Sequence, residues 1–147
     1  MHRVLEPAGW VGLCVWPSIE HSPFQYEIGK ALRRYGRNMA AEKMEAPFDF
    51  GDANELSTLM SEAGFIEIDI WAAVETISNP PPEVSVPALL AGTPIGSLFS
   101  KLSDRSRNAL IEDVSQALEP YTTKDGLTVP QAAHIALARK GQDVARN

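Results

Sequence analysis

The chain has 147 residues, of which 44% are apolar, and a net charge of −6. This length and composition predict one globular domain, residues 1–147. The acidic balance argues against binding to nucleic-acid phosphates, and no apolar run approaches the roughly 20 residues of a membrane helix. Cys14 is the only cysteine, which excludes an intrachain disulfide. Because the N-terminus also lacks a secretory pattern, we expect a cytoplasmic protein.

The first predicted strand, residues 11–16, is a nearly unbroken apolar run that follows a Pro-Ala-Gly turn. A strand that is apolar on both faces is typical of a sheet covered by helices on both sides. We therefore expect a buried central strand, with Cys14 as a small core residue, and an α/β fold.

The first predicted helix begins after Ser22. We expect the Ser22 hydroxyl to cap this helix and Gln25 to reach back as in a capping box, with the helix running to about residue 35. Residues 37–47 show no clear period, and they predict a helical or irregular lid segment.

The next helix and strand have the clearest signals in the sequence. Asp52 is a good N-cap residue and Gly64 is a good C-terminal stop, so a helix is predicted between them. Residues 66–75 then alternate strictly along the chain, and one side of the alternation is formed by Ile66, Ile68, Ile70, Ala72 and Val74. This alternation predicts a half-exposed strand at a sheet edge.

The three prolines at residues 80–82 must end this strand. We expect a helical insertion over residues 79–121, followed by a turn at residues 124–126. Its helices are predicted at residues 85–91, with Ser85 as the cap, at residues 93–101 and at residues 103–118. An extended segment, residues 127–130, leads to a final strand, residues 133–139, and to a polar tail, residues 141–147, that we expect to fray.

Six segments carry a resemblance to a known family: residues 3–9, 11–16, 47–52, 63–65, 90–94 and 133–139. In order and spacing they resemble the C-terminal half of class I S-adenosylmethionine-dependent methyltransferases, and above all those of ubiquinone and menaquinone biosynthesis. The resemblance implies a partial Rossmann-like sheet with flanking helices, made of the family's fifth, sixth and seventh strands. It also implies that the last strand lies antiparallel between the other two.

The resemblance does not extend to the family's cofactor site. In the family, a Gly-rich turn after the first strand and an acidic residue hold S-adenosylmethionine, whereas the ten glycines of this chain form no G-x-G pattern. The resemblance therefore implies a truncated chain, and we expect no cofactor to bind this chain alone. Ala8 also replaces the first glycine of the family's Pro-Gly-Gly turn. Because a positive φ would strain alanine, we expect Gly9 to adopt it instead.

The candidate substrate-binding residues lie in and after the loop that follows the first strand: Trp16, Pro17, His21 and Phe24. Sheets of α/β proteins bind ligands at the carboxyl ends of their strands, and in the family this loop borders the substrate pocket. His21 is a candidate general base because its ordinary pKa lies near neutrality, although an ordinary loop histidine fits the pattern as well. The three histidines are scattered and no Cys-x-x-Cys is present, so no metal site is predicted.

Two functions are compatible with these observations. In the first, the chain is the acceptor-side half of a methyltransferase that acts on an unidentified small molecule; whether this chain alone is an enzyme stays open. In the second, it is a non-catalytic α/β interaction module. Without the family's first four strands, residues 11–16 would have an unpaired edge that can pair with another chain. The expected partner is a second copy, which gives a homodimer, or a separately encoded N-terminal half.

Overall fold

The computed structural model describes residues 1–142, which form two compact units. The sheet unit consists of Met1–Ser18, Phe48–Val74 and the chain from Ala132 onwards. The helical unit consists of Ile19–Pro47 and Glu75–Gln131. The strands β2 (Phe65–Asn79) and β4 (Gly126–Lys140) each contribute to both units. Each unit has its own hydrophobic core.

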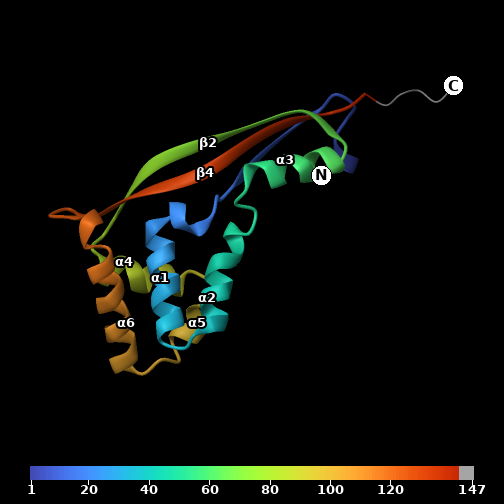
Figure 1. Cartoon of the computed structure of the whole chain (residues 1–147). Helices are drawn as coiled ribbons and strands as arrows, with labels where there is room; N and C mark the ends of the chain where they lie inside the picture. Colours follow the sequence, from blue (N-terminus) through green and yellow to red (C-terminus); the bar gives the residue numbers. More distant parts are fainter. Residues whose placement is uncertain (143–147) are drawn as a thin grey trace. The chain divides into compact units, whose positions relative to one another are not determined.

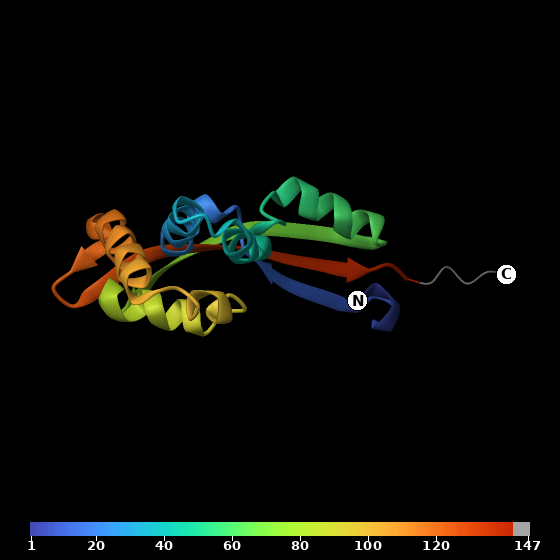
Figure 2. The same ribbon diagram turned by 90° about the horizontal axis from the view of Figure 1, so that it is seen from below.

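The strands of the sheet follow the order β1-β4-β2, so the last strand of the chain lies in the middle (Figure 2). β1 (Trp10–Val15) pairs antiparallel with β4, with Trp10 opposite Arg139 and Val15 opposite His134. A short strand, β3 (Thr122–Thr123), also pairs with the start of β4. The predicted α/β class is confirmed, as is the predicted place of the final strand between the other two.

β1 is an edge strand of the described sheet, and the prediction that both of its faces are buried is wrong. Val11 is 9% exposed, whereas Trp10 is 51% exposed. Cys14 is exposed as well and is not a core residue. The reason is that α3 (Ala53–Glu62) lies along one face of the strands (Figure 1). Its buried side chains Leu56 and Met60 join the core of the sheet unit from that face alone.

The turn before β1 adopts its positive φ at Ala8 and not at Gly9. Ala8 has φ 62°, and the Gly9 amide donates to the Glu6 carbonyl at 2.9 Å. A Cβ on Gly9 would lie only 2.9 Å from that same carbonyl oxygen. Glycine is therefore required at position 9 by close packing of the turn, and alanine takes the strained conformation at position 8.

α3 begins and ends as its sequence predicts. The Asp52 carboxylate accepts hydrogen bonds from the Asn54 amide at 2.7 Å and from the Glu55 amide at 3.2 Å. These bonds satisfy two of the amides that a helix start leaves without an intrahelical partner. Gly64 follows the helix with φ 88°, a conformation that glycine adopts at low cost.

Asp52→Ala should lower the free energy of unfolding by about 1 kcal/mol, because two first-turn amides lose their acceptor. Urea denaturation followed by circular dichroism measures this change. Asp49→Ala is the matched control: it removes an exposed carboxylate that caps no helix, and it should change stability by less than about 0.5 kcal/mol. An equal loss in both variants would contradict the capping role.

β2 is longer than predicted, and its alternation is interrupted. The strand occupies the predicted edge position and ends before the prolines. Glu67 has φ 52°, however, and Ile66 just before it is 43% exposed. Ile68 and Ile70 pack against the core of the sheet unit, whereas Val74 is 64% exposed. The predicted half-exposed edge strand is therefore confirmed, although Ile66 and Val74, at the two ends of the alternating run, are themselves exposed.

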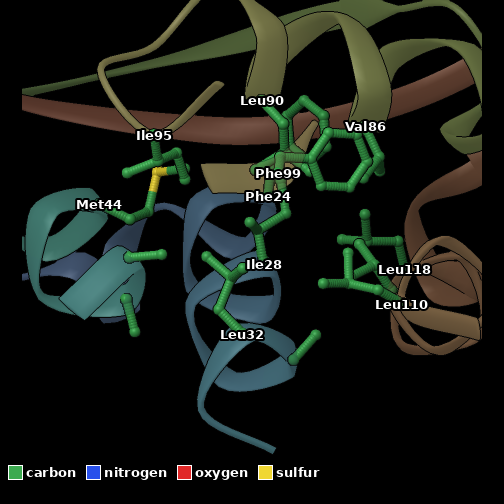
Figure 3. Close-up of a cluster of buried hydrophobic side chains, with 14 of the residues drawn as sticks. Phe24, Ile28, Leu32, Met44, Val86, Leu90, Ile95, Phe99, Leu110 and Leu118 are labelled. Atoms are coloured by element: carbon green, nitrogen blue, oxygen red, sulfur yellow. The ribbon is translucent and has the colours of Figure 1, made fainter. Parts of the chain in front are cut away.

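The helical unit contains five α-helices, and their packing forms its core. They are α1 (Pro23–Arg34), α2 (Asn38–Glu45), α4 (Pro82–Ala91), α5 (Gly96–Phe99) and α6 (Asp104–Ala117). α1 packs against α2 and α6, and α4 packs against α5 and α6. Figure 3 shows the buried cluster, to which α1 contributes Phe24, Ile28 and Leu32. Residues 37–47, predicted as a lid segment, supply α2 to this core.

The start of α1 differs from its prediction. Ser22 makes no cap hydrogen bond; its buried hydroxyl accepts a bond of 2.6 Å from the Gln131 side chain. The Gln25 side-chain oxygen is buried without a hydrogen-bond partner among the described residues, so no capping box forms. The Ser22 hydroxyl therefore accepts a hydrogen bond from Gln131, which is distant in the sequence, and does not cap the helix.

The helices of residues 79–121 also differ in extent from their predictions. α4 starts at Pro82 and contains Ser85 as a buried interior residue, so Ser85 is not its cap. α5 covers only four residues of the predicted 93–101 helix. α6 begins as predicted, because the Ser103 hydroxyl accepts a hydrogen bond from the Ser106 amide. The turn at residues 124–126 joins β3 to β4 as expected.

The description of residues 79–121 as an insertion within one domain stays a prediction. Residues 143–147 of the predicted tail lie outside the described residues.

Candidate functional site

Trp16 and Pro17 lie at the carboxyl end of β1, in the sheet unit. The Trp16 side chain is 40% exposed, and its ring centroid lies 6.4 Å from that of Phe48. Pro17 is buried. The loop after β1 thus presents one accessible indole beside a neighbouring aromatic ring.

The backbone of Gly51 packs directly on this loop. A Cβ at position 51 would lie 2.5 Å from the Ser18 nitrogen and 3.0 Å from the Pro17 carbonyl carbon. The distance to the Ser18 nitrogen is shorter than real Cβ contacts, and backbone atoms cannot move aside cheaply. Only glycine allows the chain to approach the end of β1 this closely.

His134 connects the same region to β4, and the sequence did not single it out. It lies opposite Val15 in the strand register, and its Nε2 atom is 3.0 Å from the Gly51 carbonyl oxygen. A carbonyl oxygen only accepts hydrogen bonds, so Nε2 is the donor in this contact. Nδ1 is buried and has no hydrogen-bond partner among the described residues. Only the antiparallel register, which follows from the fold, places His134 at this position.

The other two candidate residues belong to the helical unit. His21 is the last residue of the short 3-10 helix η2 (Ile19–His21), and it is exposed. Phe24 is only 5% exposed and packs in the helical core. The four candidate residues are therefore divided between the two units, and their shared role in substrate binding stays a prediction.

Two ion pairs of the helical unit join different helices. Arg33 pairs with Glu45 of α2, and Arg34 pairs with Asp113 of α6 at 2.7 Å. The hydrogen bond from Arg33 to Glu45 and the charge of that carboxylate raise the pKa of the guanidinium. Burial raises the pKa of the Tyr35 hydroxyl, and Asp113 raises it further. Both pKa shifts are explained by the packing of the helices against one another.

Residues 1–142 contain neither a candidate metal site nor a candidate membrane-spanning helix. No group of three or more His, Cys, Asp and Glu side chains in this range is arranged to hold a metal ion. None of the helices in the same range combines the length and apolar character that a membrane span requires.

Comparison with known proteins finds similar structures but no similar sequences. No family model matches the sequence, and no curated protein matches it. A solved structure from Bacillus halodurans, provisionally assigned as a methyltransferase, aligns with 96% of this chain at 14% identity and a TM-score of 0.48. Phosphoethanolamine N-methyltransferase 2 of Haemonchus contortus, in complex with phosphomonomethylethanolamine and S-adenosylhomocysteine, aligns with 96% of the chain at 14% identity and a TM-score of 0.38. The chain spans 55% of the first protein and 28% of the second. What these proteins do is therefore not assigned to this chain by the comparison.

Proposed function

We propose that the chain is the acceptor-side half of a class I S-adenosylmethionine-dependent methyltransferase. The strand order is the observation that carries this proposal: β4 lies between β1 and β2 and runs antiparallel to β1. The sequence resemblance implies this arrangement for the last three strands of the family. Three strands in this order are also the part of such a sheet that lies away from the nucleoside site.

In the complete enzyme, a methyl group would move from the sulfonium sulfur to a nucleophilic carbon, oxygen or nitrogen of a small acceptor. The residues of this chain do not fit the donor itself, because β1 is followed by Trp16, Pro17 and a short 3-10 helix and not by a Gly-rich turn. Their proposed task is to hold the acceptor, and positioning accounts for much of the rate of such a transfer. Trp16 and Pro17, which both belong to the sheet unit, would contact the acceptor.

S-Adenosylmethionine should bind the isolated chain weakly or not at all. Isothermal titration calorimetry of the full chain measures this directly, and tight binding of one ligand per chain would contradict the half-enzyme proposal. A second titration adds a separately encoded N-terminal half. This half would be found by translating the DNA upstream and looking for a strand followed by Asp or Glu-x-Gly-x-Gly. Binding should appear when the two halves are mixed, and its absence from the mixture would also count against the proposal.

The exposed edge of β1 favours a second candidate, a non-catalytic interaction module. Within residues 1–142, no strand pairs with the edge of β1 that faces away from β4. The strand contains no charged residue, and charges are a common protection of edge strands against pairing. In this function, β1 would pair with a second copy or with another chain without any methyl transfer. The oligomeric state of the purified chain tests this pairing.

A further inference from the structure

A cavity of about 310 Å³ lies in the helical unit, where α1 ends and α2 begins. It is lined by residues 36–40 together with Leu98 and Lys101. None of these residues was a candidate in the sequence, and none takes part in the proposed acceptor wall. The volume is at the lower end of the range found for small-molecule sites.

The turn between the two helices places Arg37 at this cavity. Gly36 has φ 68°, and its amide donates to the Arg33 carbonyl at 2.9 Å. The Arg37 amide donates to the Leu32 carbonyl at 2.8 Å, so the chain reverses sharply and α2 begins at once. This turn makes Arg37 one of the residues that line the cavity.

Two cationic side chains, Arg37 and Lys101, line the cavity. Arg33 and Arg34, nearby in sequence, are neutralised by carboxylates of α2 and α6. Arg37 and Lys101, by contrast, make no ion pair within the described part of the chain. No acidic residue lines the cavity. In a chain with a net charge of −6, two unneutralised cations at one cavity favour an anionic ligand.

The rest of the lining adds apolar surface. Met39, Ala40 and Leu98 supply this part. The cavity therefore combines two cationic side chains with an apolar wall.

We propose that this cavity binds a small organic anion, a carboxylate or a phosphate monoester that carries a short apolar group. Arg37 and Lys101 bind the anionic group, and Met39 with Leu98 contacts the apolar group. The inference does not depend on the proposed methyl transfer, because it uses no residue of that site.

Nuclear magnetic resonance of the ¹⁵N-labelled full chain tests the proposal with phenyl phosphate and hexanoate as probes. Both should give saturable shifts at Asn38, Met39 and Leu98, with dissociation constants of about 1 mM or lower. Neutral hexanol should give none, and inorganic phosphate should bind at least about threefold more weakly than phenyl phosphate. Shifts confined to other residues, no saturation below about 10 mM, or equal binding of phosphate and phenyl phosphate would overturn the proposal.

Arg37→Gln and Lys101→Gln should each weaken phenyl phosphate binding about threefold to tenfold. Arg105→Gln is the matched control, because Arg105 is an exposed arginine of α6 that does not line the cavity. It should leave the dissociation constant unchanged. All three side chains are exposed, so each variant should fold. A dispersed spectrum of each variant checks this. Equal weakening in the control would reveal nonspecific charge attraction and overturn the assignment.

Discussion

The Gly12→Lys variant should associate about 100-fold more weakly than the unaltered chain. Gly12 is an exposed residue of the edge strand β1, and a Cβ built on it meets no atom within 4 Å. The lysine therefore enters without a clash inside the chain. Because glycine weakens a strand interior, the substitution should not destabilise the sheet.

The expected loss follows from the physics of an open strand edge. β1 presents unpaired backbone groups along its outer edge, and its exposed side chains include Trp10 and Cys14. A partner strand would satisfy those groups and cover the apolar side chains. A lysine in the middle of the strand would then be brought against that partner, where desolvation of its ammonium group opposes pairing. In a dimer of two copies, repulsion between the two lysines adds to this cost.

Sedimentation velocity over a range of concentrations measures the association. Gly141→Lys adds the same charge at a position that also has no atom within 4 Å of the new Cβ, but it lies outside β1. Gly12→Ala adds a side chain without a charge. Both controls should associate like the unaltered chain. An unaltered chain that stays monomeric, or a Gly12→Lys variant that associates equally well, would count against pairing through β1, with a second copy or with a separate half.

The parts of the fold that were predicted correctly depend on neighbours in the sequence. Asp52 and Ser103 cap their helices because the amides that they bind lie two or three residues away. The prolines end β2 because they lack a backbone donor, and the turn before Gly126 needs only its own residues. The position of the last strand was predicted from the family resemblance, since no local pattern encodes strand order.

The predictions that were wrong depend on residues far away in the chain. Ser22 has the residue type of a cap, but its hydroxyl is bound by Gln131, 109 residues later. Cys14 is apolar enough for a core, yet α3 covers the opposite face of its strand. Similarly, His134 could not be placed beside Gly51 before the register of β4 was known. For the candidate site, the sequence located the end of β1 but not what packs against it.

Gly126→Ala should lower the free energy of unfolding by more than about 2 kcal/mol. Gly126 begins β4 with φ 129°, a conformation that residues with a Cβ rarely adopt. Its new Cβ would also lie 2.3 Å from the Asn79 carbonyl oxygen, at the end of β2. Because the obstacle is backbone, relief requires movement of the segment that joins β2 to α4. Two costs, conformational strain and steric overlap, therefore act at one position.

Gly36→Ala separates these two costs within the same helical unit. Gly36 has φ 68°, but a Cβ at this position would meet no atom within 4 Å, so this variant should lose only about 1 kcal/mol. Gly141→Ala, which meets neither obstacle, should change stability by less than about 0.5 kcal/mol. Urea denaturation of the three variants gives the comparison. If Gly126→Ala lost no more than Gly36→Ala, the close approach between the start of β4 and Asn79 would be absent in solution. The backbone at the start of β4 would then not lie against the end of β2.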